Sequence, residues 1–328
     1  MNEIYAKYTS KIFNNYPVKE FSEKINNCKV SMRSNNSFFE IIIDGLKIIE
    51  KLLRLLAEIE ELIFFYIGSF PRLISLKKNG NDIDFSNRID KYITSNNYVR
   101  NNLLICDISS ETISEEKIIK MREMKKIPLY SLQYLVSEAY DKVVTNHKMT
   151  LLLHIVEGVY LNFCDSSVTN EIQQKIYSKF PVSKSNRIGR FMVAVYWLSD
   201  NYLFRYHRKY NCNILQLLKM TKYKFISCLS DTRNWYSHFL NKDKENKLEE
   251  GQDFIICFEI VSYMLRLAVI DKISVPVIEA NIQEYYYSIH DWILEVLYNK
   301  DQPLKSRTYS DYKKCQEFKN EINKLTQN

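Results

Sequence analysis

Three residues in the C-terminal third of the chain have types and spacing suited to chemistry on a phosphodiester. Arg233, Asn234 and His238 occur as Arg-Asn-x-x-x-His. A planar guanidinium binds a phosphate through two parallel hydrogen bonds, and an imidazole transfers protons near neutral pH. An arginine and a histidine at such a spacing are common, whereas the added asparagine lowers the chance expectation to about 0.02. The pattern therefore marks these three residues as candidate catalytic residues.

Each residue of the pattern can take one role in cleaving RNA. Arg233 would hold the scissile phosphate and stabilise the charge that develops on it. His238 would act as general base or acid, and Asn234 would orient that imidazole or contact the phosphate. On a helix, Asn234 and His238 share a face because they are four residues apart, and the long side chain of Arg233 reaches the same cleft.

The nucleophile in this reaction would be the RNA 2′-hydroxyl, which needs neither a metal nor a cofactor. The expected product is a 2′,3′-cyclic phosphate. One copy of the motif supplies one imidazole, whereas in-line cleavage uses an acid and a base on opposite sides. We therefore expect a homodimer whose composite active site combines two motifs.

Basic residues gather in the sequence just before the motif. The net charge is +7, and Asp200 is the one acidic residue between positions 183 and 226. Positive charge attracts polyanions, which predicts RNA binding by Arg187, Arg190, Arg205, His207, Arg208 and Lys209. Aromatic residues alternate with them and would either stack on unpaired bases or belong to the core: Tyr196, Trp197, Tyr202, Phe204, Tyr206 and Tyr210.

Apolar residues at helical spacing predict the elements that must position the motif. The predicted helices cover residues 37–67, 129–144, 148–164, 185–208, 213–239, 252–271 and 277–298. The motif lies in the helix 213–239. Consecutive helices with short connections favour an antiparallel bundle.

The first 128 residues have a weaker pattern. Residues 73–76 followed by the turn residues 77–81 indicate a strand and a turn, and residues 103–105 indicate a second short strand. Residues 108–127 are charged and are expected to form a linker with a short helix. The predicted fold class is mainly α, with a smaller, mostly helical α+β region at residues 1–128, a helical domain at 129–298 and a polar tail at 299–328.

Composition narrows the function classes. Six Gly and six Pro in 328 residues disfavour Gly-rich nucleotide loops, and no Walker A, His-Glu-x-x-His or Gly-x-Ser-x-Gly motif is present. The seven Cys are widely spaced and show no zinc-ligand spacing. We expect no metal site, no membrane segment, since Glu58, Glu60 and Glu61 break the best apolar run, and a cytoplasmic location. The three glutamates are expected on a solvated face.

Two polar residues of the predicted helix 148–164 have open roles. His154 lies in an apolar run and is expected to be a core histidine. Glu157 is either a buried partner of Arg233 or Arg190, or a partly exposed helix residue.

The Arg-Asn-x-x-x-His pattern on a late helix of a bundle resembles the HEPN superfamily, which includes metal-independent ribonucleases of prokaryotic defence. The string that resembles its ApeA-type branch, the abortive-infection phage-exclusion proteins, is Asp231-Thr232-Arg233-Asn234-Trp235-Tyr236-Ser237-His238. Residues 151–157 are similar to the opening helix of that branch, and the resemblance covers about residues 140–298. Arg233, Asn234 and His238 match the family motif.

The resemblance implies an antiviral endoribonuclease that is toxic when activated, and it implies a sensing or specificity role for residues 1–128. A phage-derived trigger or an antitoxin would be a partner. Two alternatives stay open: a non-catalytic HEPN-like module that binds RNA or protein, and a HEPN toxin controlled by a separate antitoxin.

Overall fold

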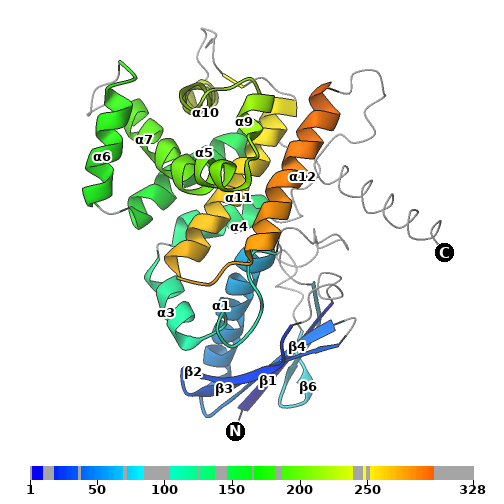
Figure 1. Ribbon diagram of the computed structural model, residues 1–328. Coiled ribbons are helices and arrows are strands. Elements are labelled where there is room, and N and C mark those ends of the chain that lie inside the picture. Colours follow the sequence, from blue (N-terminus) through cyan, green and yellow to red (C-terminus); the bar gives the residue numbers. More distant parts are fainter. Residues whose placement is uncertain are drawn as a thin grey trace, which may run out of the picture. The chain divides into compact units, whose positions relative to one another are not determined.

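Helices dominate the computed structural model, and one antiparallel sheet lies near the N-terminus (Figure 1). The structure describes residues 2–9, 18–35, 38–68, 72–84, 104–124, 126–136, 146–164, 166–181, 187–238, 247–248 and 252–298. The chain divides into two units. The first comprises Met1–Val143 with Arg266–Ile282, and the second comprises Val144–Leu265 with Gln283–Asn328.

The sheet of the first unit has six strands in the order β2-β3-β4-β1-β5-β6. Their bounds are Asn2–Thr9 for β1, Phe21–Ile25 for β2, Cys28–Asn35 for β3, Phe38–Gly45 for β4, Arg72–Lys78 for β5 and Asn81–Asp82 for β6. All neighbouring strands are antiparallel. Buried and partly exposed residues alternate along β4, as expected for a sheet with one covered face.

The prediction that residues 1–128 are mostly helical was wrong, and so was a single helix at 37–67. Residues 38–45 form β4, and the helix α1 covers only Ile49–Ile67. The apolar residues Phe38, Ile42 and Leu46 have helical spacing, but Phe38 and Ile42 are only partly buried and Leu46 is 89% exposed. The side chains that β4 buries alternate instead, which is the period of a strand.

The strand and turn predicted at residues 73–81 are confirmed by β5 and β6. Asn79 and Gly80 connect these strands, and both have positive φ, 49° and 80°. Two successive residues of this kind form the tight turn that matches the twist of a hairpin. Leu104 and Ile105 form no strand, and residue 103 lies outside the described residues.

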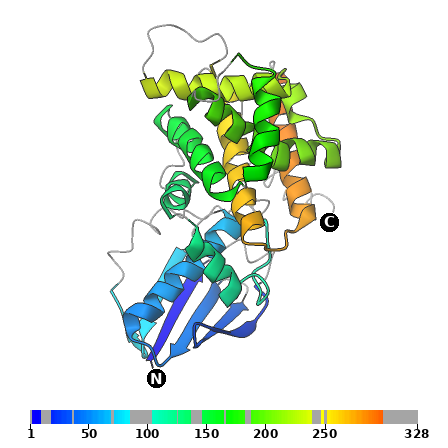
Figure 2. The same ribbon diagram turned by 90° about the vertical axis from the view of Figure 1, so that its left-hand side faces the viewer.

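Helix α1 packs against one face of the sheet, with contacts to β1 and β4 (Figures 1 and 2). The expected solvated face of Glu58, Glu60 and Glu61 was wrong, because all three residues are buried. Tyr8 donates its hydroxyl to Glu60 Oε1 at 2.5 Å. Arg122 on α3 (Glu115–Glu123) donates to both carboxylate oxygens of Glu58, at 2.8 and 2.6 Å. Buried carboxylates are stabilised by such hydrogen bonds, which here tie α1 to its neighbours.

Helix α1 ends at a glycine, and a buried arginine contacts its last carbonyls. Gly68 has φ 81° and its N–H donates to the Phe64 carbonyl at 2.7 Å, the usual left-handed helix end. Arg266 is 1% exposed and donates Nη2 to the Phe65 carbonyl at 2.8 Å and to the Tyr66 carbonyl at 3.2 Å. These carbonyls lack partners inside the helix; Arg266 satisfies that of Phe65 and shares that of Tyr66 with the Ile105 N–H, which donates to it at 2.7 Å.

The second unit is helical. Its helices are α5 (Asn146–Phe163), α6 (Ser166–Tyr177), α7 (Arg187–Ser199), the π-helical segment η5 (Asp200–Phe204), α8 (Arg205–Tyr210), α9 (Ile214–Leu217) and α10 (Lys222–His238). Helices α11 (Gln252–Lys272) and α12 (Glu279–Tyr298) contribute residues to both units. Helix α5 packs against α7 and α10, and α7 also packs against α6 and α10. These contacts make α5, α7 and α10 the framework of the motif.

Most of the predicted helices are present, with changed bounds. The helix predicted at 185–208 is a helix, a π-helical segment and a second helix in succession, and α6 was not predicted. The predicted boundary after residue 128 lies inside α4 (Lys126–Val136), which belongs to the first unit. None of the helices in the described part of the chain has the length and apolar character needed to cross a membrane. The predicted tail, 299–328, lies outside the described residues.

Candidate functional site

The guanidinium of Arg233 is held between α5 and α7. Arg233 Nη2 donates to Glu157 Oε2 on α5 at 2.7 Å. The Arg233 Cζ lies 4.6 Å from the centre of the Phe191 ring on α7, within the range of a cation–π contact. Glu157 thus pairs with Arg233, but it is a partly exposed helix residue and not a buried partner, because its side chain is 23% exposed. The guanidinium is therefore fixed on two sides by side chains from different helices.

His154 lies beside this ion pair and is exposed, so the expectation of a core histidine was wrong. Its Nδ1 is 3.5 Å from Arg233 Nη2, and its Nε2 is 3.3 Å from Ser237 Oγ. His154 and Glu157 are one turn apart on α5, and Arg233 and Ser237 are one turn apart on α10, so each pair shares a helix face. The structure thus brings together two side chains from each helix.

The surroundings of Arg233 lower the pKa of its guanidinium without neutralising it. Burial lowers the pKa of Arg233, the nearby Glu157 carboxylate raises it, and the positive charge of Arg187 lowers it. The net pKa is below the ordinary value for arginine, and arginine remains protonated in proteins. Arg233 Nε is buried and has no hydrogen-bond partner among the described residues. This nitrogen is out of reach of a ligand, so an anion would bind the exposed part of the side chain, which is 11% exposed.

Of the two other residues of the motif, the structure describes the side chain of Asn234 but not that of His238. Asn234 is 7% exposed, so its amide has little access to a substrate in this structure. His238 is the last residue of α10, and its side chain lies outside the described residues. The expected position of its imidazole therefore stays a prediction.

The predicted RNA-binding arginines are exposed but do not all lie at the motif. Arg187 is near enough to act on the pKa of Arg233. Residues Arg190, Arg205, Arg208 and Lys209 are exposed as well. The charge of Lys222, at the start of α10, acts on His207 of α8, which places α8 near that end of the helix. Arg233 is about 16 Å further along α10, so the basic residues of α8 form a separate group.

His207 was predicted to contact RNA from a basic face, and this was wrong. It is buried, 9% exposed, and its ring makes an edge contact with Tyr286 at 6.1 Å between centroids. Burial, then the charges of Lys222 and Arg208, lower the pKa of His207 to about 4. A neutral imidazole in the core cannot serve as a cationic RNA contact.

The aromatic residues around α7 and α8 belong to the core and do not form a base-stacking surface. All six are buried: Tyr196, Trp197, Tyr202, Phe204, Tyr206 and Tyr210. The hydroxyl of Tyr286 donates to the Tyr202 carbonyl in the π-helical segment, and Tyr263 stacks on Tyr285 with ring centroids 3.5 Å apart. Of the two roles left open for these side chains, packing is the one observed.

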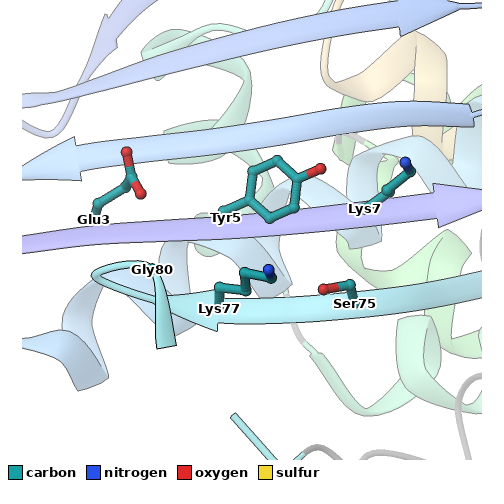
Figure 3. Close-up of a pocket in the computed structure, with 6 residues that line it drawn as sticks. All are labelled: Glu3, Tyr5, Lys7, Ser75, Lys77 and Gly80. Atoms are coloured by element: carbon teal, nitrogen blue, oxygen red, sulfur yellow. The ribbon is translucent and has the colours of Figure 1, made fainter. Parts of the chain in front are cut away.

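A depression of about 420 Å³ lies on the sheet of the first unit (Figure 3). It is lined by Glu3, Tyr5, Lys7, Ser75, Lys77 and Gly80. Its charges are compensated locally, since Lys7 lies 3.9 Å from Glu40, and Lys77 lies 3.9 Å from Asp82. Tyr5 donates to Glu40 at 2.7 Å, and burial together with this contact raises the pKa of Tyr5 to about 12. Paired charges on an open strand surface indicate a solvated face.

Sequence reasoning missed Ser237 and the exposure of His154. Ser237 occupies an unspecified position of the motif, but it follows Arg233 by four residues and so shares its face. His154 and Glu157 are the polar residues, at i and i+3, of the otherwise apolar run 151–159, which was the available signal. Within the described residues, no three His, Cys, Asp or Glu side chains group in a way that could hold a metal ion. The chain matches no protein-family model, no curated protein and no solved structure.

Proposed function

We propose that this protein is a metal-independent endoribonuclease of the HEPN type. The observation that supports the proposal is a fixed guanidinium beside an exposed imidazole on adjoining helices. Arg233 is held by Glu157 at 2.7 Å, and His154 lies 3.5 Å from it. A positively charged group at a proton-transfer group is the arrangement that phosphodiester cleavage uses.

In the proposed reaction, Arg233 binds the scissile phosphate and stabilises the charge that develops on its oxygens. The RNA 2′-hydroxyl loses its proton to a base and attacks phosphorus. The bond from phosphorus to the 5′-oxygen breaks, and this oxygen takes a proton from an acid. The products are a 2′,3′-cyclic phosphate and a 5′-hydroxyl, and His238 is one of the two proton-transfer groups.

The biological setting proposed here follows from the resemblance of the motif. The ribonuclease would act in antiphage defence by abortive infection, in the cytoplasm, under control of a phage-derived trigger or an antitoxin. A homodimer is proposed as well. Exposed Arg187 and Arg190 are the basic residues nearest in sequence to the α7 residue Phe191, which contacts the guanidinium, and they would guide RNA to it.

The test is cleavage of total RNA in EDTA by the wild-type protein, Arg233→Ala and His238→Ala, followed by mapping of product ends. We expect cyclic phosphate ends from the wild type, and loss of cleavage by at least about 100-fold in each variant. The matched control is His290→Ala, a partly exposed histidine on α12, which should cleave like the wild type. Full activity in the Arg233→Ala, His238→Ala double variant would end the proposal.

A second function is favoured by the burial of the motif. The Arg233 side chain is 11% exposed and is already paired with Glu157, and Asn234 is 7% exposed. Such residues also stabilise a helical module that binds RNA or protein without cleaving it. In that case RNA would bind with an affinity that falls steeply with salt, and no cleavage products would form.

A further inference from the structure

We infer that His154 is the general base of this site and that it belongs to the same chain as the Arg233 it serves. The inference rests on the proposed ribonuclease function and deepens it, because it names a second proton-transfer residue outside the Arg-Asn-x-x-x-His motif. His154 is on α5 and Arg233 is on α10, and both helices belong to the second unit.

The position of His154 is set by contacts on both of its ring nitrogens. Nδ1 faces Arg233 Nη2 at 3.5 Å, and Nε2 faces Ser237 Oγ at 3.3 Å. Glu157 follows one turn later on the same helix and holds the same guanidinium nitrogen at 2.7 Å. The imidazole is therefore oriented by the residue that would bind the phosphate.

The contact with Arg233 assigns the protonation state of the ring. A guanidinium has donors and no acceptor, so it can hydrogen-bond Nδ1 only when this nitrogen carries a lone pair. The proton of the neutral ring is then on Nε2, where it donates to Ser237 Oγ. A guanidinium that transfers this hydrogen bond to a phosphate oxygen when RNA binds would free the Nδ1 lone pair beside the phosphate, which is what a general base requires.

The step can be written with all protons placed. The 2′-hydroxyl of an RNA whose phosphate lies on Arg233 gives its proton to His154 Nδ1. The O2′–P bond forms, the P–O5′ bond breaks, and the leaving 5′-oxygen receives a proton from the acid, which we assign to His238. No metal, water molecule or oxidant takes part in this step.

Because His154 would supply the second imidazole, a dimer is no longer needed to provide it. The motif alone supplies one imidazole per chain, and a composite site was expected to supply the other from a second copy. With His154 and His238 acting together, one chain contains both proton-transfer groups. The homodimer stays a prediction, but the reaction no longer depends on it for a second histidine.

The first experiment compares His154→Gln with His147→Gln. Both histidines are exposed on α5, so the substitutions are matched in type, helix and exposure. The substrate is an oligoribonucleotide that contains a cleavage site mapped in total RNA. We expect His154→Gln to lower kcat by about 100-fold or more with little change in KM, and His147→Gln to cleave at the wild-type rate.

The second experiment identifies His154 as the base and not the acid. In a substrate whose bridging 5′-oxygen is replaced by sulfur, the leaving thiolate departs without taking a proton. His154→Gln should stay about 100-fold slower than the wild type on this substrate, because the 2′-hydroxyl still needs a base. Recovery to the wild-type rate would assign His154 as the acid and overturn the inference.

The third experiment asks whether His154 and Arg233 act within one chain. Equal amounts of His154→Gln and Arg233→Ala protein are mixed, unfolded together and refolded. We expect no recovery of cleavage, because each chain lacks one member of the pair. Recovery of activity would show that the pair is shared between chains and would contradict the same-chain assignment.

The outcomes separate this inference from the proposed function. If the wild type cleaves RNA and His154→Gln cleaves equally well, the role of His154 is refuted and the ribonuclease proposal survives. If the wild type releases no cyclic phosphate products, the ribonuclease proposal fails and the role of His154 fails with it.

Discussion

Replacing Gly68 by alanine tests how the C-terminus of α1 is held. Gly68 has φ 81°, and a Cβ built there would lie 2.6 Å from Arg266 Nη1 and 2.9 Å from its Cζ. A long side chain on the surface would move aside at little cost. Arg266 is 1% exposed and is held by hydrogen bonds to the Phe65 and Tyr66 carbonyls, so it cannot move without breaking them.

The magnitude has two parts. An alanine in the left-handed region costs about 1–2 kcal/mol relative to glycine. Loss of at least one hydrogen bond from a buried charged group costs about 1.5–3 kcal/mol more. We therefore expect Gly68→Ala to lower the free energy of unfolding by roughly 2.5–5 kcal/mol.

Gly80→Ala is the matched control. Gly80 has φ 80° and no atom within 4 Å of a built Cβ, so it has the conformational cost without the contact. Urea denaturation of the two variants should differ by roughly 0.5–1 M in midpoint, because a stability difference of about 1.5–3 kcal/mol is divided by a urea slope of about 3 kcal/mol/M. Equal midpoints for Gly68→Ala and Gly80→Ala would refute the role of Arg266. In an Arg266→Ala background, Gly68→Ala should cost only about 1–2 kcal/mol.

Three further predictions concern buried or partly buried polar groups. Tyr8→Phe removes a 2.5 Å hydrogen bond to the buried Glu60 carboxylate and should lower the free energy of unfolding by about 2 kcal/mol; an unchanged urea midpoint would contradict this. Glu157→Gln removes the counter-charge of Arg233 and should lower stability by about 1–2 kcal/mol, as measured by thermal unfolding at low and high salt. The pKa of His207 is lowered to about 4 by burial, so protons bind first to the unfolded state as pH falls. The contribution of His207 to stability should thus be constant above about pH 6.5 and fall between about pH 6.5 and 4, and His207→Phe should remove this part of the pH dependence of urea unfolding.

The helices of the second unit were predictable because their signal is local. The predicted segments 148–164, 252–271 and 277–298 correspond to α5 (Asn146–Phe163), α11 (Gln252–Lys272) and α12 (Glu279–Tyr298). A continuous apolar stripe at helical spacing reports which residues face the core. Such a pattern depends only on residues that are close together in the sequence. It can therefore be recognised without knowing which elements pack beside the helix.

Strands β1 to β4 were missed because the pattern of a sheet depends on pairing between distant segments. β1 pairs with β4 and β5, and Tyr5 faces Ile42 on one side and Lys77 on the other. These strands have 5 to 8 residues. In so short a segment the same apolar residues can fit both the alternation of a strand and the spacing of a helix, so the sequence does not distinguish the two. Burial by the sheet partners and α1 decides between the two, and that information is not local.

For the candidate site, the sequence by itself determined which residues of α10 could do chemistry, since Arg233, Asn234 and His238 lie within one and a half turns of a helix. Tertiary structure alone decided what surrounds them. His154 and Glu157 are 79 and 76 residues from Arg233 in the chain, and only the packing of α5 on α10 brings them into contact. Helical periodicity marks the face of each helix that is buried, but it does not say which helix lies opposite, so an exposed histidine beside an arginine could be recognised only once the chain had folded.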